Sequence, residues 1–263
     1  MTAHLVQAPP SGFTRSQVAT LAGLPETYAA AASGSVRIVD GAPGWVDRAV
    51  RAVDSGVRAL VVDRPAPEPV AQVGSLRDLA RAHSVVVAVD SPYVGSPTWG
   101  ASRDRLLADV AGIALLDAVA VVGDPRDLER ALLAQVAVVR PLLRRTTLRR
   151  SAPGSSMLVT DDGDLVTSVA ATVSVTPGLV LELVGARVRW RIELPDDGTA
   201  RPGRAVRHDA TGETAIRPIY ATSSRSTWLA LAARLDGSST DVLYDLDALL
   251  LDLEVLAGGL PAR

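Results

Sequence analysis

The sequence predicts an α/β protein in two parts. We expect residues 1–122 to form a shortened Rossmann-like half with a parallel sheet, and residues 123–263 to form an α+β half with an open, antiparallel-rich sheet. In the first part, short apolar runs alternate with segments of helical period, the order that builds parallel sheets with right-handed crossovers. After about residue 145, apolar and polar residues alternate one by one, as in strands with one buried face.

Strands and helices alternate through the first part. The apolar runs are short and flanked by Gly or Pro, which predicts strands in "HLVQ", "SVRIVD", "VRALVVD" and "VVVAVD". Between them, apolar residues recur at helical spacing in "SQVATLAGL", "WVDRAVRAVDSG" and "EPVAQVGSLRDLARAHS". The last of these strands leads into "SPYVGSPTWG", which its prolines and glycines predict to be a loop.

The second part mixes helices with alternating strands. Asp124 and Pro125 open a helix, while the apolar run "IALLDAVAVV" before it fits either a helix or a strand. In "RVRWRIEL" the even-numbered positions are apolar and the odd-numbered ones charged, which predicts one buried and one exposed face. "ARPGRAVRHDATGETAIRPIY" is predicted to be a hairpin, and two helical segments close the chain.

The composition excludes several kinds of chemistry and partner. A net charge of −2 gives no basic field for nucleic acid or an anionic membrane, and no apolar run reaches the roughly 20 residues that span a bilayer. The chain has neither Cys nor Lys, which excludes thiolate nucleophiles, Schiff bases and a P-loop lysine. His4, His83 and His208 are too scattered for a metal motif. The N-terminus lacks a basic, apolar leader, so we expect a cytoplasmic protein.

One stretch carries a family resemblance. "AVDSGVRALVVDRPAPEPVAQVGSLRDLARAHSVVVAV" resembles the signature region of the glucose–fructose oxidoreductase / inositol dehydrogenase (Gfo/Idh/MocA) family. In that family a helix and a glycine lead into a strand that ends Glu-Lys-Pro, where this chain has Asp63-Arg64-Pro65. The resemblance extends over about residues 35–260. It implies a nicotinamide-dependent oxidoreductase of sugars or cyclitols, with a Rossmann domain and a substrate-facing sheet domain.

The phosphate-binding loop that the resemblance implies is degenerate. A dinucleotide fold needs glycines after its first strand, so that backbone N–H groups can approach the pyrophosphate. Here "QAPPSGFTRS" offers Gly12 alone, and Pro9 and Pro10 have no N–H to donate. The acidic residue expected about 20 positions later is also absent. We therefore predict no cofactor, with NAD or NADP as the alternative.

The catalytic residues that the resemblance implies are changed as well. Arg64 stands at the position of the family's Glu-Lys-Pro lysine, and arginine stays protonated and is a poor proton shuttle. The family also carries an Asp followed four residues later by a catalytic His. The best match is Asp117, with Val121 at the position of the His. We therefore assign no catalytic residue and expect a degenerate active site.

Two ligand sites are open to test. Asp63 and Arg64 at a strand end, with the aromatic residues Tyr93 and Trp99 of the following loop, are candidates for one ligand pocket. Each feature also has a purely structural explanation. Asp63 and Arg64 could form a strand-end turn, and the loop could pack Tyr93 and Trp99 onto the core. Alternatively, Asp63, Asp90 and Asp117 at strand ends could hold Mg²⁺ in an unrelated enzyme.

These residues predict a protein with an oxidoreductase-like fold that does not catalyse the oxidoreductase reaction. We expect a protein that has lost dinucleotide binding and catalysis and acts as a partner or regulatory subunit or binds a carbohydrate-like ligand. The alternative is an active sugar or cyclitol oxidoreductase with an altered NAD(P) site. The polar face of the second sheet, with Ser168, Thr172, Ser174, Arg187, Arg189 and Arg191, predicts a homodimer, or a heterodimer with a catalytically complete relative.

Overall fold

A computed structural model describes residues 3–9, 11–24, 26–143, 149–150, 157–161, 165–197, 201–238 and 244–257. The chain forms two compact units: Met1–Gly95 with Thr222–Leu250, and Ser96–Ala221 with Leu251–Arg263. This division differs from the boundary expected at residue 122. The strand that ends at Val122 pairs with strands that follow it, and a later helix returns to the first sheet.

Unit 1 contains a five-stranded parallel sheet in the order β2-β1-β3-β4-β5. Its strands are β1 (His4–Gln7), β2 (Tyr28–Ala31), β3 (Val36–Asp40), β4 (Ala59–Asp63) and β5 (Val86–Asp90). The Rossmann-like parallel sheet predicted from the sequence is confirmed. The sequence analysis missed β2, because the alanines of "YAAA" are depleted in strands and carry no strand signal.

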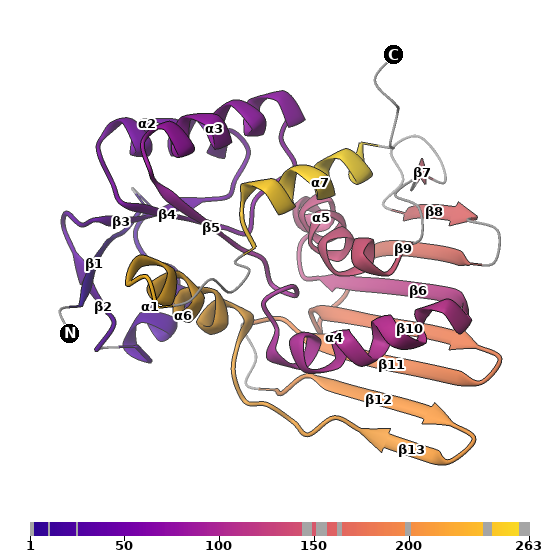
Figure 1. The fold of residues 1–263 in the computed structure, drawn as a ribbon. Coiled ribbons are helices and arrows are strands. Elements are labelled where there is room, and N and C mark those ends of the chain that lie inside the picture. The colour runs from indigo at the N-terminus through magenta and orange to yellow at the C-terminus, as the bar shows by residue number, and fades with distance from the viewer. Residues whose placement is uncertain are drawn as a thin grey trace. The chain divides into compact units, whose positions relative to one another are not determined.

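Helices cover the two faces of this sheet. α1 (Arg15–Ala22) and α6 (Ser223–Leu235) share one core with alternate strand residues, comprising Val6, Leu21, Leu24, Tyr28, Val36, Ile38, Ala59, Val61, Ala88, Trp228, Leu231 and Ala232. α2 (Trp45–Asp54) packs on β3 and β4, and α3 (Val70–Ala82) packs on β5. Because successive strand residues point to opposite faces, α2 and α3 cover the other side (Figure 1).

The strand order of this sheet reverses between β1 and β3. The chain runs outward from β1 to β2, crosses back over β1 in residues 32–35, and then builds β3 to β5 in the opposite direction. Gly34 lies against the main chain of Leu5, where a side-chain methyl group would overlap the Leu5 carbonyl. Ala31 at the end of β2 and Arg37 near the start of β3 both lie level with Gln7 of β1. The segment between β2 and β3 can therefore be short, because it does not have to run back along the length of the strands. A full dinucleotide fold has a further strand on this side, and the described part of this chain has none there.

Unit 2 contains an eight-stranded mixed sheet in the order β13-β12-β11-β10-β6-β9-β8-β7. The strands are β6 (Ile113–Val122), β7 (Arg149–Arg150), β8 (Met157–Asp161), β9 (Val166–Val173), β10 (Gly178–Gly185), β11 (Val188–Pro195), β12 (Arg204–Asp209) and β13 (Gly212–Ala215). Every neighbouring pair is antiparallel except β6 with β9. The antiparallel-rich sheet and the 204–215 hairpin are confirmed, and "IALLDAVAVV" is a central strand.

Two helices cover one face of this sheet. α4 (Pro97–Asp109) packs on β11 and β12, and α5 (Leu128–Val139) packs on β6 and β9. The side chains of Val188, Trp190, Ile192 and Leu194 are buried on that face, as the alternation predicts. The predicted loop "SPYVGSPTWG" is wrong in its second half, because Ser96 and Pro97 begin α4. Proline suits the first turn of a helix, because a backbone N–H there would have no hydrogen-bond partner within the helix.

The remaining elements are short connections and the last helix. Single 3-10 turns occupy Val110–Gly112, Pro125–Asp127 and Arg140–Leu142. α7 (Leu246–Leu256) begins among the residues of unit 1 and ends among those of unit 2. None of the helices in the described ranges is long and apolar enough to cross a membrane.

Candidate functional site

Three carboxylates end neighbouring strands of the parallel sheet. Asp40, Asp63 and Asp90 are the last residues of β3, β4 and β5, and each is level with the next in the sheet register. The carboxyl ends of parallel strands are where open α/β sheets bind their ligands. This edge of unit 1 is therefore the first place to look for a site.

The chain turns sharply after Asp63. Arg64 has a φ of 47°, a left-handed conformation that is uncommon for residues with a side chain. Its amide donates a hydrogen bond to the carbonyl of Asp90 at 3.0 Å, and the amide of Gly41 donates to the carbonyl of Asp63 at 2.9 Å. Gly41 lies so close to the Asp63 carbonyl that a side chain there would overlap it. The Asp63-Arg64-Pro65 turn is thus locked to both neighbouring strands.

Two backbone amides at the start of α1 are hydrogen-bonded to side chains of the same turn. Thr14 and Gln17 form a reciprocal capping box, in which the Gln17 amide donates to Thr14 Oγ1 at 3.2 Å and the Thr14 amide donates to Gln17 Oε1 at 2.9 Å. The Gly12 amide donates to the Pro9 carbonyl at 2.9 Å. These amides occupy the place where a dinucleotide fold presents free N–H groups to the pyrophosphate. Pro10 lies outside the described residues.

Side chains from α1 and α6 reach the aspartates at the strand ends. The Gln17 side chain donates a 2.7 Å hydrogen bond to Asp63 Oδ2, and Ser224 Oγ lies 2.6 Å from Asp90 Oδ2. Thr20 Oγ1 contacts Ser224 Oγ at 3.4 Å, and Ser223 Oγ donates to the Ser91 carbonyl at 2.7 Å. The carboxyl edge is therefore bridged by hydroxyl and amide groups of the unit's own helices.

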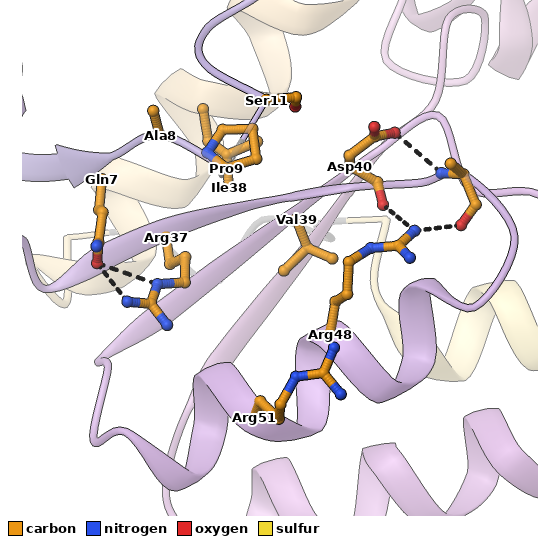
Figure 2. Close-up of a pocket in the computed structure, with 11 residues that line it drawn as sticks. Gln7, Ala8, Pro9, Ser11, Arg37, Ile38, Val39, Asp40, Arg48 and Arg51 are labelled. Atoms are coloured by element: carbon orange, nitrogen blue, oxygen red, sulfur yellow. Dashed lines mark hydrogen bonds between the residues drawn. The ribbon is translucent and has the colours of Figure 1, made fainter.

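A cavity of about 500 Å³ lies beside the point where the strand order reverses. The chain just after β1 lines one side of it through Ala8, Pro9 and Ser11. β3 contributes residues 37–40, and α2 contributes Arg48 and Arg51. In Figure 2 the Arg37 and Arg48 side chains extend into the space between β3 and α2, and the Arg51 side chain runs along α2. The cavity is contained within unit 1.

The aromatic pair predicted to form a stacking wall is buried. Tyr93 and Trp99 are each 2% exposed, Tyr93 in unit 1 and Trp99 in the first turn of α4 in unit 2. Arg64 is half-buried in unit 1. A ligand pocket that joins Asp63, Arg64, Tyr93 and Trp99 stays a prediction.

Asp117 belongs to the mixed sheet of unit 2 and not to the parallel sheet of unit 1. It sits in the middle of β6 in unit 2, opposite Glu182 of β10 and Ser168 of β9, and Val121 follows on the same strand. It is therefore a mid-strand residue and not a strand-end residue, contrary to the expectation behind a magnesium site. Among the described residues no group of three or more His, Asp or Glu side chains could hold a metal ion.

The second face of the unit 2 sheet is open. Val184, Leu115 and Val166 lie side by side across β10, β6 and β9, and they are 37%, 40% and 49% exposed. The next row along the strands is polar, with Glu182, Asp117 and Ser168. Glu182 binds both Arg189 and Arg191 of β11, and their attraction lowers the pKa of the Glu182 carboxyl although burial opposes it. The exposed arginine face predicted from the sequence is confirmed.

The comparisons with known proteins concern the whole chain. No family model and no curated protein matches the sequence. A solved structure from Magnetospirillum magnetotacticum that carries an oxidoreductase assignment superposes with a TM-score of 0.72 at 16% identity, over 98% of this chain and 99% of that chain. A 3-ketoreductase from Actinomadura kijaniata, solved with NADP and TDP-benzene, gives 0.67 at 12% identity, over 97% and 98%.

A sugar-nucleotide enzyme has the same architecture. The UDP-N-acetylglucosamine 3-dehydrogenase from Acidithiobacillus ferrooxidans gives a TM-score of 0.66 at 11% identity, over 98% of this chain and 97% of that chain. This chain has the fold of the Gfo/Idh/MocA-type oxidoreductases. The resemblance read from the Asp63-Arg64-Pro65 stretch is thereby confirmed at the level of the fold. At these identities the likeness describes the fold and not the chemistry.

Sequence reasoning missed the cavity and the capping box as site features. Arg37, Arg48 and Arg51 are spread over a strand and a helix, and no local motif joins them. The capping box has a signal, because Thr14-Arg-Ser-Gln17 fits the pattern of Ser or Thr followed three residues later by Glu or Gln. The sequence does not reveal that Gln17 also reaches Asp63, which lies 46 residues away.

Proposed function

We propose that this protein is a non-catalytic relative of the Gfo/Idh/MocA oxidoreductases that serves as a structural or regulatory subunit. In this proposal the fold is retained, dinucleotide binding in the usual mode and hydride transfer are lost, and the open sheet face of unit 2 is the assembly surface. The observation that carries the proposal is the state of the α1 N-terminus. The backbone amides of Thr14 and Gln17 donate to each other's side chains in the capping box, and Pro9 has no N–H.

The distribution of proton-transfer groups supports the same proposal. Hydride transfer to or from a carbon–oxygen bond needs a group that gives or takes a proton near neutral pH. The chain has no Lys. His4 is the first residue of β1 and His83 follows the last residue of α3, so both lie near the amino ends of parallel strands. His208 lies on β12 of unit 2. At the carboxyl edge Arg64 keeps its proton, and Asp63 and Asp90 accept hydrogen bonds from Gln17 and Ser224.

One alternative is an active oxidoreductase with an altered NAD(P) site. Its support is the nearly complete overlap with a ketoreductase that was solved with NADP. It requires the dinucleotide to bind where the Thr14 and Gln17 backbone amides are already bonded and where Gly12 is the single glycine of the loop after β1. We favour the non-catalytic proposal because the capping box of α1 and the proline-containing loop after β1 both reduce the N–H groups that could bind a pyrophosphate.

The proposed assembly surface is the row of Val184, Leu115 and Val166 with its flanking polar row. Exposed aliphatic side chains in one row favour burial against a partner, with a gain of about 25 cal/mol per Å² of apolar area. Arg189 and Arg191 are already paired with Glu182 and Glu193 of the same chain. These arginines therefore need no carboxylate of a partner, and the apolar row supplies the reason to associate. We propose a homodimer through this face.

The test compares two valine substitutions by sedimentation of the full chain. Val184→Glu places a charge in the exposed row, and we expect it to convert a dimer at tens of micromolar into a monomer. Val175→Glu adds the same charge at a valine that is 95% exposed and lies outside the sheet, and it should leave the dimer intact. A wild-type monomer with no co-purifying partner, or a dimer that survives Val184→Glu, contradicts the proposed surface.

A further inference from the structure

We propose that the cavity between the loop after β1, strand β3 and helix α2 binds the phosphate group of a phosphorylated small molecule. The proposal concerns a site within unit 1 and does not depend on the assembly proposed for unit 2. It rests on the cavity's origin in the shortened fold, on the charge of its walls and on the way its arginines are held.

The short crossover leaves this side of β1 uncovered. Leu5 and Gln7 point to the face of the sheet that carries α2 and α3, while Val6 points into the core under α1 and α6. α2 packs on β3 and β4, and Leu5 remains 48% exposed. Where a doubly wound fold has further structure between its two halves, this chain has residues 32–35. The result is a hollow of about 500 Å³.

The walls of the hollow carry an excess of positive charge. Arg37, Arg48 and Arg51 line it against one carboxylate, Asp40. The Asp40 side chain is exposed and accepts a 2.9 Å hydrogen bond from the Ala42 amide, which holds it at the end of β3. A protein with a net charge of −2 thus concentrates three guanidinium groups around one hollow. Such a local field attracts anions.

The arginines are held by neutral groups and keep their charge available. Arg37 donates to Gln7 Oε1 from Nε at 3.0 Å and from Nη2 at 2.5 Å, and to Ser55 Oγ at 3.3 Å. Arg48 donates to the main-chain carbonyls of Asp40 at 2.9 Å and Pro43 at 3.2 Å, and also to that of Ala42 (Figure 2). In the described part of the chain none of the three arginines forms an ion pair. Neutral acceptors orient a guanidinium without neutralising it.

The three arginines approach the hollow from two elements. Arg48 and Arg51 are three residues apart on α2, which places them as neighbours on one helix face. Arg37 comes from the strand below and is fixed by Gln7, its register partner on β1. Planar guanidinium groups bind phosphate oxygens through two parallel N–H donors, so several of them around one space suit a phosphate monoester. Pro9 and Val39 provide an apolar wall for the rest of such a molecule.

The test is calorimetric titration of the full chain at constant ionic strength. The probes are inorganic phosphate, glucose 6-phosphate and AMP, with glucose and adenosine as the matched compounds that lack phosphate. We expect saturable binding of the three phosphate-bearing probes and none of glucose or adenosine. Equal affinity for all three would mean that the site binds the phosphate alone, and tighter binding of one ester would identify the class of the organic part. Binding of adenosine as tight as that of AMP overturns the proposal.

The decisive variant is Arg51→Gln. The Arg51 side chain is exposed and makes no hydrogen bond or ion pair within the described residues, so its replacement should not affect folding. Loss of one charge-assisted donor is expected to weaken phosphate binding about tenfold or more. Arg105→Gln is the matched control, because Arg105 is an exposed helical arginine of unit 2 and the change in net charge is the same. No binding at 10 mM phosphate, or an equal loss in both variants, contradicts the site.

The Arg37→Gln variant provides a second, independent reading. It should also weaken phosphate binding, and circular dichroism and the melting temperature will show whether the fold is kept. NADPH carries a phosphate monoester and NADH does not. Binding of NADPH that Arg51→Gln removes would therefore support the cavity while contradicting the loss of dinucleotide binding. Binding of NADH and NADPH that Arg51→Gln leaves unchanged would contradict the proposed loss of dinucleotide binding. The cavity proposal would then be decided by the phosphate titration.

Discussion

At the scale of single residues, Gly34 sets the geometry from which the cavity arises. The chain crosses β1 at this position, and the backbone of Leu5 leaves no room for a side chain. Any other residue would push the crossover away from β1 and shift β3 relative to its neighbours. A glycine in "AASGSV" looks like an ordinary turn residue in the sequence. The close approach of two backbones, which explains it, is a tertiary contact.

Substitution of Gly34 by Ala tests this contact. Because the added methyl group must displace main chain, we expect the free energy of unfolding to fall by about 1–3 kcal/mol, the usual cost of overpacking. Gly74→Ala is the matched control, since Gly74 lies inside α3 with no atom within 4 Å of the added methyl group. It should be neutral or stabilise by up to about 1 kcal/mol. Urea denaturation measures both, and an equal response of the two variants would contradict the close crossing.

At the scale of elements, one ionic cluster joins a helix to two strands of unit 2. Asp109, at the end of α4, accepts hydrogen bonds from Arg207 Nε and Trp190 Nε1, each at 2.8 Å. Arg207 also binds Asp209 of β12. The hydrogen bond from Arg207 lowers the pKa of Asp109 although burial opposes it, and Trp190 adds to the lowering. The cluster thus fixes α4 to β11 and β12.

This cluster predicts a loss of stability in acid. Asp109 has a lower pKa in the folded chain than in the unfolded chain, where an aspartate titrates near about 3.9. Its contribution is therefore complete above about pH 4 and is lost as the pH falls below that value. Asp109→Asn should lower the free energy of unfolding by about 1 kcal/mol at pH 7 and flatten its decline between about pH 4 and pH 2.

The control for this prediction is Asp104→Asn. Asp104 lies on the same helix, is exposed and pairs with its neighbour Arg103. We expect the unfolding profile of this variant to follow the wild type from pH 7 to pH 2. Part of the acid dependence should remain in Asp109→Asn, because the pKa of Asp209 is lowered to about 2 by Thr211 and Arg207. An Asp109→Asn profile as steep as the wild type would contradict the role of the cluster.

The elements were predictable where local pattern and tertiary role agree. β3, β4, β5 and the helices α2 and α3 follow from short apolar runs and helical spacing, and β11 follows from strict alternation between Val188 and Leu194. β2 and β6 were not assigned, the first because alanine is depleted in strands and the second because its ten-residue, mostly apolar run fits either a helix or a strand. α4 was missed because Pro97, which reads as a breaker, begins the helix.

At the scale of the whole chain, the fold resembles that of oxidoreductases while the residues of the candidate site differ from those that the family resemblance implies. The likeness to solved oxidoreductases extends over nearly the entire length at 11–16% identity. What the sequence could predict of the site was the altered set of residues at positions 9, 12, 64 and 121. What it could not predict was the arrangement, because the bond from Gln17 to Asp63 and the three arginines around one hollow depend on residues brought together by the fold.

The most direct test of the loss of dinucleotide binding is titration of the full chain with NADH and with NADPH. Calorimetry and nicotinamide fluorescence report the binding. Because Pro9 lacks an N–H and the capping box binds the backbone amides of Thr14 and Gln17, we predict no saturable binding of either dinucleotide tighter than about 1 mM, which corresponds to about 4 kcal/mol. A micromolar dissociation constant for either dinucleotide, with enhanced nicotinamide fluorescence, would contradict the account.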